Sequence, residues 1–236
     1  FIAEEGATIQ FSGGTAPPNE LNGEVGGYGT IHFLSGTTNI NGSYDVKGHT
    51  RIGGRSDMNY PAKARFNSAA ETADLTLDDI YSYQGGTGTL TVTRKCNWFG
   101  GGFPDSGKTV IAAGAELITG DGSKALNGHT IDNAGTAWLR GYTDGSGPFN
   151  NLAGGTVIVE YSVPAILHGI TFVNAGTLVL KGGAVGTFEI RGAYKQTGTG
   201  VLDIELGERV AGTQFGCLIV SSWWWTGRAE LDGTLK

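Results

Sequence analysis

Apolar and polar residues alternate along much of the chain in short segments that end at glycine or asparagine. Residues 44–46 alternate in this way, and residues 201–206 place Leu202, Ile204 and Leu206 at every second position. A period of two residues is that of a β-strand with one buried and one hydrated face. The pattern therefore predicts many short strands.

Helical periodicity is confined to one short segment, residues 112–117. Gly114 interrupts this segment, and the run from Gly120 to Gly122 would end it. Because strands do not alternate with helices, an α/β fold is not expected. The chain is predicted to be all-β, apart from a short helix over 112–117.

The strand segments repeat at a regular distance. Glycine followed by threonine or valine opens a strand at Gly135, Gly155, Gly176 and Gly200, in steps of 20, 21 and 24 residues. A turn glycine, a short strand and a period near 20 residues are typical of a β-solenoid. We predict a right-handed parallel β-helix with about 20 residues per coil. Strands spaced about 8–12 residues apart also suit an antiparallel β-sandwich, which is the alternative.

Composition narrows the class of protein. Glycine supplies 42 of 236 residues, but six prolines and the lack of a three-residue period exclude collagen. The net charge of -6 and the absence of a basic cluster argue against nucleic acid as a partner. The chain has no run of about 18 apolar residues, so no segment is predicted to insert into a membrane.

The chain offers no linker that would divide it, so residues 1–236 are predicted to form a single solenoid domain. Phe1 and Lys236 both fall within a repeat phrase. A solenoid needs polar caps on its end coils, and neither terminus has the composition of one. We therefore interpret the sequence as a fragment or processed segment of a longer protein.

Several segments resemble a known class of repeat. They combine Asn, Gly and Thr with short apolar runs, at residues 97–101, 109–115, 126–136, 149–155 and 194–204. The chain resembles the Gly/Thr/Asn-rich repeat regions of large secreted or surface-displayed bacterial proteins, including autotransporter passenger regions. The resemblance implies a parallel β-solenoid, an extracellular or cell-surface location, and a role as a stalk, adhesin or matrix component.

Three functions are compatible with this pattern. The first is a non-enzymatic structural or adhesive segment, because open solenoid ends expose strand edges that like modules could extend. The second is a carbohydrate-binding module. The third is a polysaccharide-degrading enzyme with carboxylates on a lateral groove. We favour the first, which predicts no catalytic residue, no cofactor, and partners that are like modules or neighbouring domains.

Tryptophans and carboxylates are the candidates for the other two functions. Three consecutive rings, Trp223, Trp224 and Trp225, could stack on glycans or anchor a partner, or could cover an open coil end. Trp98 and Trp138 each lie inside a strand phrase and are predicted to be packing residues. The carboxylate candidates for glycoside hydrolysis are two closely spaced pairs, Asp203 with Glu205 and Asp78 with Asp79.

Residues 102–109 match the phosphate-binding pattern GxxxxGK[ST] in full. The pattern requires a buried strand before it and a helix after it, and the residues that follow, 110–114, do not predict a proper helix. We interpret the match as an ordinary turn.

Metal sites find little support in the sequence. No pair among His32, His49, His129 and His168 has zinc-site spacing. His49 and His129 each follow glycine and precede threonine, which predicts equivalent turns of the repeat. Asp105, Asp121 and Asp144 lie in predicted turns, where an aspartate side chain usually bonds to its own backbone. A structural calcium ion bound by these carboxylates is the alternative.

Two further features bear on processing. Cys96 and Cys217 could be two buried thiols, one disulfide, or links to segments outside this sequence. Asn41-Gly42-Ser43 is an N-glycosylation sequon, which would matter at Asn41 if the source is eukaryotic and the protein is secreted.

Overall fold

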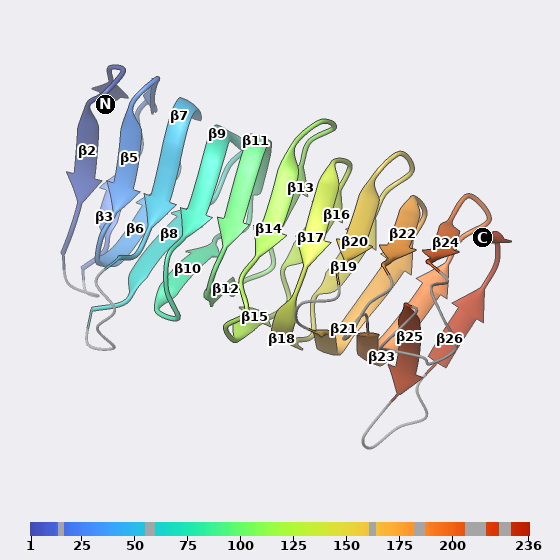
Figure 1. The fold of residues 1–236 in the computed structure, drawn as a ribbon. Helices are drawn as coiled ribbons and strands as arrows, with labels where there is room; N and C mark the ends of the chain where they lie inside the picture. Colours follow the sequence, from blue (N-terminus) through green and yellow to red (C-terminus); the bar gives the residue numbers. More distant parts are fainter. Residues whose placement is uncertain (14–16, 55–59, 161–163, 182–186, 206–215, 222–227) are drawn as a thin grey trace.

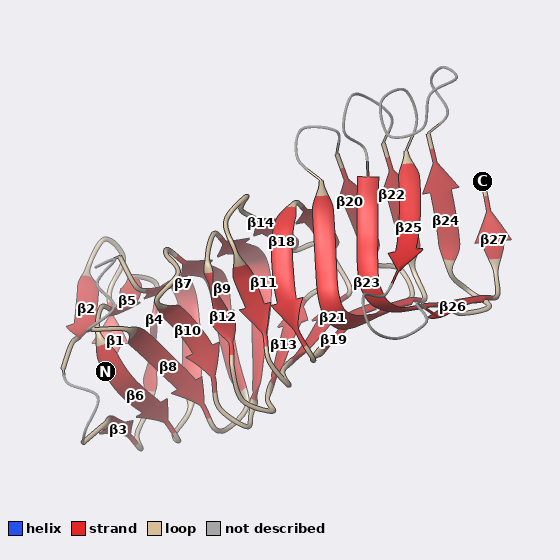
Figure 2. Ribbon diagram, turned by 90° about the horizontal axis from the view of Figure 1, so that it is seen from below, coloured by secondary structure: helices blue, strands red, loops and turns tan. Residues whose placement is uncertain are grey.

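The computed structural model describes residues 1–13, 17–54, 60–160, 164–181, 187–205, 216–221 and 228–236. Within these residues it contains 27 strands and no helix. Every strand pairing is parallel, and the strands wind into a solenoid that runs from the N-terminal to the C-terminal end of the chain (Figures 1 and 2). The predicted parallel β-solenoid is confirmed, and the β-sandwich alternative is wrong.

Strands stack on three faces, which we call A, B and C. Face A consists of β2 (Thr8–Phe11), β5 (Thr30–Phe33), the second halves of β7 (Tyr44–Ile52), β9 (Ala70–Leu77) and β11 (Thr89–Trp98), and then β14 (Glu116–Thr119), β17 (Thr136–Leu139), β20 (Thr156–Val159), β22 (Thr177–Leu180), β24 (Val201–Ile204) and β27 (Thr234–Leu235). Its ten inter-strand steps of about 4.8 Å give the stack a length of about 50 Å.

Face B precedes face A along each coil. It consists of β1 (Ile2–Ala3), β4 (Val25–Gly27), the first halves of β7, β9 and β11, then β13 (Lys108–Ile111), β16 (Thr130–Asn133), β19 (Pro148–Asn151), the second halves of β21 (Ala165–Asn174) and β23 (Thr187–Gln196), and β26 (Arg228–Leu231).

Face C closes each coil between faces A and B. It consists of β3 (Asn19–Leu21), β6 (Gly36–Ile40), β8 (Ala62–Phe66), β10 (Ser82–Gly85), β12 (Gly101–Phe103), β15 (Lys124–Leu126), β18 (Gly141–Gly145), the first halves of β21 and β23, and β25 (Cys217–Ser221).

The register gives the length of a coil directly. On face A, Thr136 lies opposite Thr156 and Thr156 lies opposite Thr177, so these coils are 20 and 21 residues long. Residues 112–117, predicted as a short helix, instead form a turn followed by β14. The helix prediction is wrong because this segment has to supply a corner and a strand on face A, in register with β11 and β17.

The core is a set of rows in which equivalent residues of successive coils lie on one another. One row on face A is entirely buried, and its members follow each other in register: Leu75, Cys96, Leu117, Ala137, Val157 and Leu178. A second row stacks rings on face B, with centroids of Phe149 and Phe172 5.5 Å apart and those of Phe172 and Tyr194 6.0 Å apart. Each buried side chain of this size contributes about 1.5–3 kcal/mol of hydrophobic stabilisation.

A buried asparagine row fastens the corner between faces B and A. Asn133 donates to the Oδ1 of Asn151 at 2.9 Å, and Asn151 donates to the Oδ1 of Asn174 at 2.8 Å. Each amide also donates to a backbone oxygen of the next coil, at Thr156, Thr177 and Val201. The row ends at Asn133, whose Oδ1 is buried without a hydrogen-bond partner among the described residues. The preceding position in this register is Ile111, which offers no donor in its side chain.

Replacing Asn151 by leucine should lower the free energy of unfolding by about 3 kcal/mol, because the buried acceptors on Asn174 and Thr177 lose their donor. Urea denaturation measures the change. The matched control is Asn150→Ala, at a half-buried residue on the outer side of the same strand with one bond to Asp132. It should cost less than about 1 kcal/mol. Equal losses in the two variants would contradict a stabilising role for the buried row.

Corner glycines are required where coils touch. A Cβ built on Gly42 would lie 2.1 Å from the backbone oxygen of Gly23, whereas a Cβ on Gly23 would meet nothing within 4 Å. Both residues lie at the corner between faces C and B, and neither has a positive φ. Comparing the same substitution at the two sites therefore isolates the effect of close contact between successive coils.

Gly42→Ala should destabilise the protein by about 2 kcal/mol, because the added methyl group forces two coils apart. Gly23→Ala should stay within about 0.5 kcal/mol of the parent. Thermal denaturation of the two variants provides the comparison. If Gly42→Ala were as stable as Gly23→Ala, the close contact between coils at this corner would be disproved.

Candidate binding groove on face A

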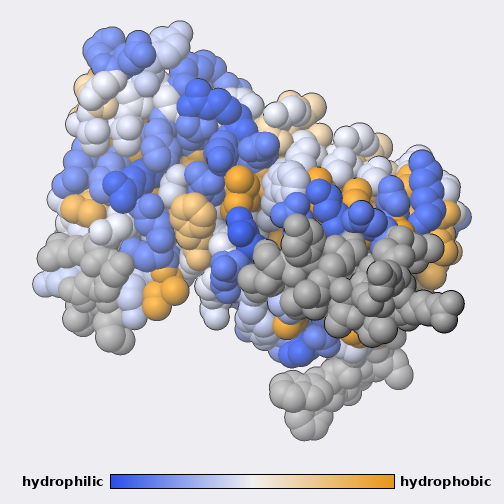
Figure 3. All heavy atoms as spheres, in the orientation of Figure 1, coloured by the Kyte–Doolittle hydropathy of each residue, from blue (hydrophilic) through white to orange (hydrophobic). Residues whose placement is uncertain are grey.

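Four neighbouring strands of face A carry an apolar strip on their outer side. Ile118, Trp138, Ile158 and Val179 lie opposite one another in register and are half-buried. We call these four residues the apolar strip. It covers three inter-strand steps, or about 14 Å along the solenoid axis. Hydrophobic residues on the face seen in Figure 3 form separate patches among hydrophilic ones.

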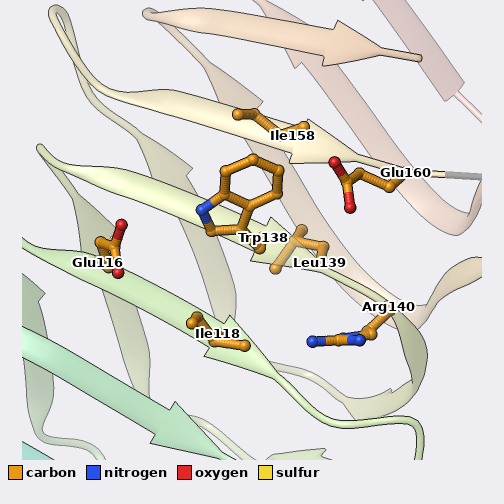
Figure 4. A pocket seen from close by; sticks show the side chains of 7 residues that line it. All are labelled: Glu116, Ile118, Trp138, Leu139, Arg140, Ile158 and Glu160. Atoms are coloured by element: carbon orange, nitrogen blue, oxygen red, sulfur yellow. The ribbon is translucent and has the colours of Figure 1, made fainter.

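A groove of about 340 Å³ lies over this strip. Figure 4 shows the indole of Trp138 between Glu116 on one side and Glu160 on the other, with Arg140 at the same end of the groove as Glu160. The groove is lined by Glu116, Ile118, Trp138, Leu139, Arg140, Ile158 and Glu160. It therefore combines an aromatic surface with a charged rim.

The charged groups of the rim differ in their bonding partners within the protein. Lys181 lies 3.3 Å from Glu160, and its ammonium is 5.4 Å from the centroid of the Trp138 ring. Arg140 donates to the backbone oxygen of Thr119 at 2.8 Å. No hydrogen bond or ion pair reaches the exposed carboxylate of Glu116 from the described part of the chain. Glu116 is thus an acceptor that a ligand could use.

The two tryptophans predicted as packing residues differ. Trp98 is buried, 1% exposed, and its ring packs edge-on against Phe103 with centroids 4.6 Å apart, so the prediction is confirmed there. For Trp138 the prediction is wrong, because its ring lies on the outer side of face A in the groove. Its neighbours Ala137 and Leu139 are both apolar and both buried, so the sequence around Trp138 does not show which side faces outward.

A second hollow, of about 480 Å³, lies on face C. Tyr83 and Tyr142 stand at its sides, and the small residue Ala125 lies between them. Asp144 is 2.6 Å from the Nδ1 of His168, whose ring stacks on Tyr142. The carboxylate of this hollow is therefore already engaged.

Lys124 lies under the hollow of face C and is buried, 3% exposed. Its ammonium donates to the backbone oxygens of Gly120 and Gly122, at 2.6 Å each. Burial lowers the pKa of Lys124 to about 8. This lysine closes the corner between faces A and C.

The segment that matches a phosphate-binding loop is a solenoid corner. Residues 102–109 leave β12 on face C and enter β13 on face B, and no helix follows in the described structure. The hydroxyl of Thr109 is buried and bonds to Gln84 and His129, while Lys108 lies 2.6 Å from Asp132. Both residues that would contact a nucleotide and its metal are thus used within the fold.

The two carboxylate pairs lie at different places. Asp78 accepts from Arg51 at 2.5 Å, and Asp79 accepts from the backbone nitrogens of Gly54 and Tyr81 at 2.9 and 2.8 Å. These groups hold the corner between faces A and C. Asp203 lies opposite Val179 on the outer side of face A, and Glu205 follows the end of the same strand.

Metal-binding chemistry has few groups to draw on. No cluster of three or more His, Cys, Asp or Glu within the described ranges could hold an ion. Among the calcium candidates, Asp105 accepts from Arg65 at 3.1 Å, Asp144 contacts His168, and Asp121 lies 3.8 Å from Arg140.

Both cysteines have free thiols in this structure. Cys96 is fully buried on the inner side of face A, and burial raises its pKa to about 12, which makes it a poor nucleophile. Cys217 opens β25 on face C and is half-buried. Trp223, Trp224 and Trp225, predicted as a binding element, lie outside the described residues.

The sequon residue Asn41 is exposed at the corner between faces C and B. Its amide nitrogen donates to the Oε2 of Glu20 and the Oδ1 of Asn22, both at 2.9 Å. The atom to which a glycan would be attached is thus part of an outer polar row.

The comparisons with known proteins add no relative. No family model, no curated protein and no solved structure matches the chain. Among the described residues, no helix has the length and hydropathy needed to cross a membrane.

His129 is fully buried and packs its ring on Phe103, with centroids 5.2 Å apart. Thr109 donates to Gln84, so the Nε2 of His129 donates to Thr109, at 2.9 Å. Nδ1 then has no partner among the described residues. Burial lowers the pKa of His129 to about 4, because a second proton would place an uncompensated charge in the core.

This histidine should make the protein acid-sensitive. Between about pH 6.5 and the lowered pKa of His129 near 4, the unfolded chain binds a proton that the folded chain rejects. Stability should therefore fall by up to about 3 kcal/mol as pH drops through this window. In His129→Gln the difference in unfolding free energy between pH 7.5 and 4.5 should shrink by most of that amount. An unchanged difference would show that His129 does not carry the effect.

Proposed function

We propose that the chain is a non-enzymatic structural or adhesive segment of a secreted or surface-displayed protein, acting as a rigid stalk, matrix element or filament-forming unit. The observation that supports this most is the continuous stacking of strands on three faces along the described chain. The likeness of its Gly/Thr/Asn-rich repeats to those of autotransporter-type bacterial surface proteins supports the extracellular location.

Rigidity follows from how successive coils are joined. Each coil is hydrogen-bonded to the next on all three faces, for example through β14 and β17, β15 and β18, and β16 and β19. Bending the rod would stretch ladder bonds on one side and compress packed rows on the other. A parallel solenoid is therefore a stiff spacer that needs no pocket for its function.

The partners that we propose are like modules or neighbouring domains placed end to end. A strand with one paired edge exposes backbone groups that accept a further parallel strand. Of the described strands, β1, β2 and β3 pair only with strands of the following coil, and β25, β26 and β27 only with those of the preceding one.

Small-angle scattering and electron microscopy of the purified chain test this proposal. We expect stiff rods whose length per copy is about 50 Å, the ten inter-strand steps of face A, and longer rods or filaments as concentration rises. A compact particle would contradict the rod. Rods that stay single at every concentration would contradict assembly from like modules.

An activity assay tests the non-enzymatic part of the proposal. Release of reducing ends from polysaccharides should be no higher for the parent chain than for an Asp203→Asn, Glu205→Gln variant. Turnover that is present in the parent and lost in this variant would overturn the proposal in favour of a polysaccharide-degrading enzyme.

A further inference from the structure

We propose that the groove over the apolar strip of face A binds a neutral oligosaccharide, with the indole of Trp138 as its platform. This goes beyond the structural role and does not depend on self-association. The groove volume of about 340 Å³ lies in the range of small-molecule sites.

The platform suits one face of a sugar ring. The C–H groups of a pyranose lie on its flat faces, whereas its hydroxyl groups point outward around the edge. Trp138 lies on the outer side of the sheet, between Ile118 and Ile158 of the neighbouring strands. A flat aromatic surface with apolar neighbours can take up the C–H face, and a polar rim can then bond to the edge.

The rim offers both donors and acceptors. Glu116 and Glu160 can only accept, while Arg140 and Lys181 can only donate. Figure 4 shows the indole nitrogen, a further donor, on the Glu116 side of the ring. Because each sugar hydroxyl both donates and accepts, such a mixed rim fits a polyhydroxyl ligand.

Charge selects a neutral ligand. Around the groove, Lys95 lies opposite Glu116 in register, Arg140 lies 3.8 Å from Asp121, and Lys181 lies 3.3 Å from Glu160, so carboxylates and cations are equal in number. An anionic or a cationic ligand would meet repulsion from one set for every attraction to the other. A neutral ligand can instead bond to the rim without leaving any of its charges unpaired.

The strip is long enough for more than one sugar. Thr136, Thr156 and Thr177 form a row beside it, in register with Glu116. Their hydroxyls recur at the inter-strand distance of about 4.8 Å. A chain of sugars lying along the axis would therefore meet a repeating polar edge next to a repeating apolar strip.

Lys181 partly covers the platform and must move when a sugar stacks. Its ammonium stands over the ring at 5.4 Å and is held by Glu160 at 3.3 Å. A single exposed cation–π contact is weak, and the long side chain can swing aside while it keeps Glu160 as a partner. In the displaced position Lys181 would uncover the ring and still lie at the rim beside Glu160.

Binding of the full chain to neutral oligosaccharides of six sugars, namely cello-, xylo-, malto- and mannohexaose, tests the proposal by calorimetry. We expect at least one to bind, and Trp138→Ala to weaken that binding about tenfold or more through loss of ring stacking. Trp138→Phe should retain part of the affinity.

Two aromatic residues elsewhere provide matched controls. Tyr28 is 70% exposed at the corner between faces B and A, and Tyr83 borders the hollow of face C. Tyr28→Ala and Tyr83→Ala should bind like the parent, and circular dichroism should show that all variants remain folded.

Several results would overturn the proposal. They are no binding of any of the four hexaoses, equal binding by Trp138→Ala and the parent, loss of binding in Tyr83→Ala instead, or loss only on replacing Trp223, Trp224 and Trp225. Concentration-dependent dimerisation abolished by Trp138→Ala, without sugar binding, would assign the groove to a second copy of the chain.

Discussion

Every feature of this protein depends on one distance, the separation of two hydrogen-bonded parallel strands. In the described strands, residues paired in register on successive coils lie about 4.8 Å apart, on all three faces. At this distance a corner residue meets backbone atoms rather than side chains. The backbone oxygen of Gly23 would be 2.1 Å from a Cβ on Gly42, and that of Ala115 equally close to one on Gly135. Many of the 42 glycines therefore reflect repeated contact between coils.

The same distance explains how polar residues are tolerated inside. A single buried asparagine would leave a donor or an acceptor without a partner, but a row of asparagines at this spacing lets each amide serve the next. Asn133, Asn151 and Asn174 form such a row, and Gln196 continues its bonding pattern toward the backbone of Thr234. The cost appears at the end of the row, where Asn133 Oδ1 has no partner among the described residues. A buried polar row is thus stabilising only where each amide has a hydrogen-bonding partner in the neighbouring coil.

Repetition is what the sequence reveals most directly. The Gly-Thr phrases and their period predict the parallel solenoid because each phrase marks the same corner, between faces B and A, at Gly135, Gly155 and Gly176. A single phrase does not reveal which of its alternating residues face the core and which face outward. Trp138 and Trp98 both lie in strand phrases, yet one ring points outward and the other inward.

Local motifs mislead for the same reason. His49 and His129 share the flanking residues Gly and Thr, but His49 opens the face A part of β7, whereas His129 lies in the corner before β16 on face B. Their predicted equivalence is wrong. The phosphate-loop pattern at 102–109 likewise combines one corner with the ends of two strands. In each case the structural role of a residue depends on its position within the coil, and a short motif does not give that position.

The alternation of inward and outward residues separates stability from recognition. On β17, Ala137 and Leu139 belong to the core, and Trp138 between them contributes mainly to the outer surface. Outward positions can therefore change without disturbing the stacked rows beneath. Corners do not have this freedom, since Arg140 at the end of the groove also bonds to the backbone of Thr119. On such a rod, the outward side chains of the strands can vary and so form different ligand surfaces. The corner residues, which also bond to the backbone, limit the extent of these surfaces.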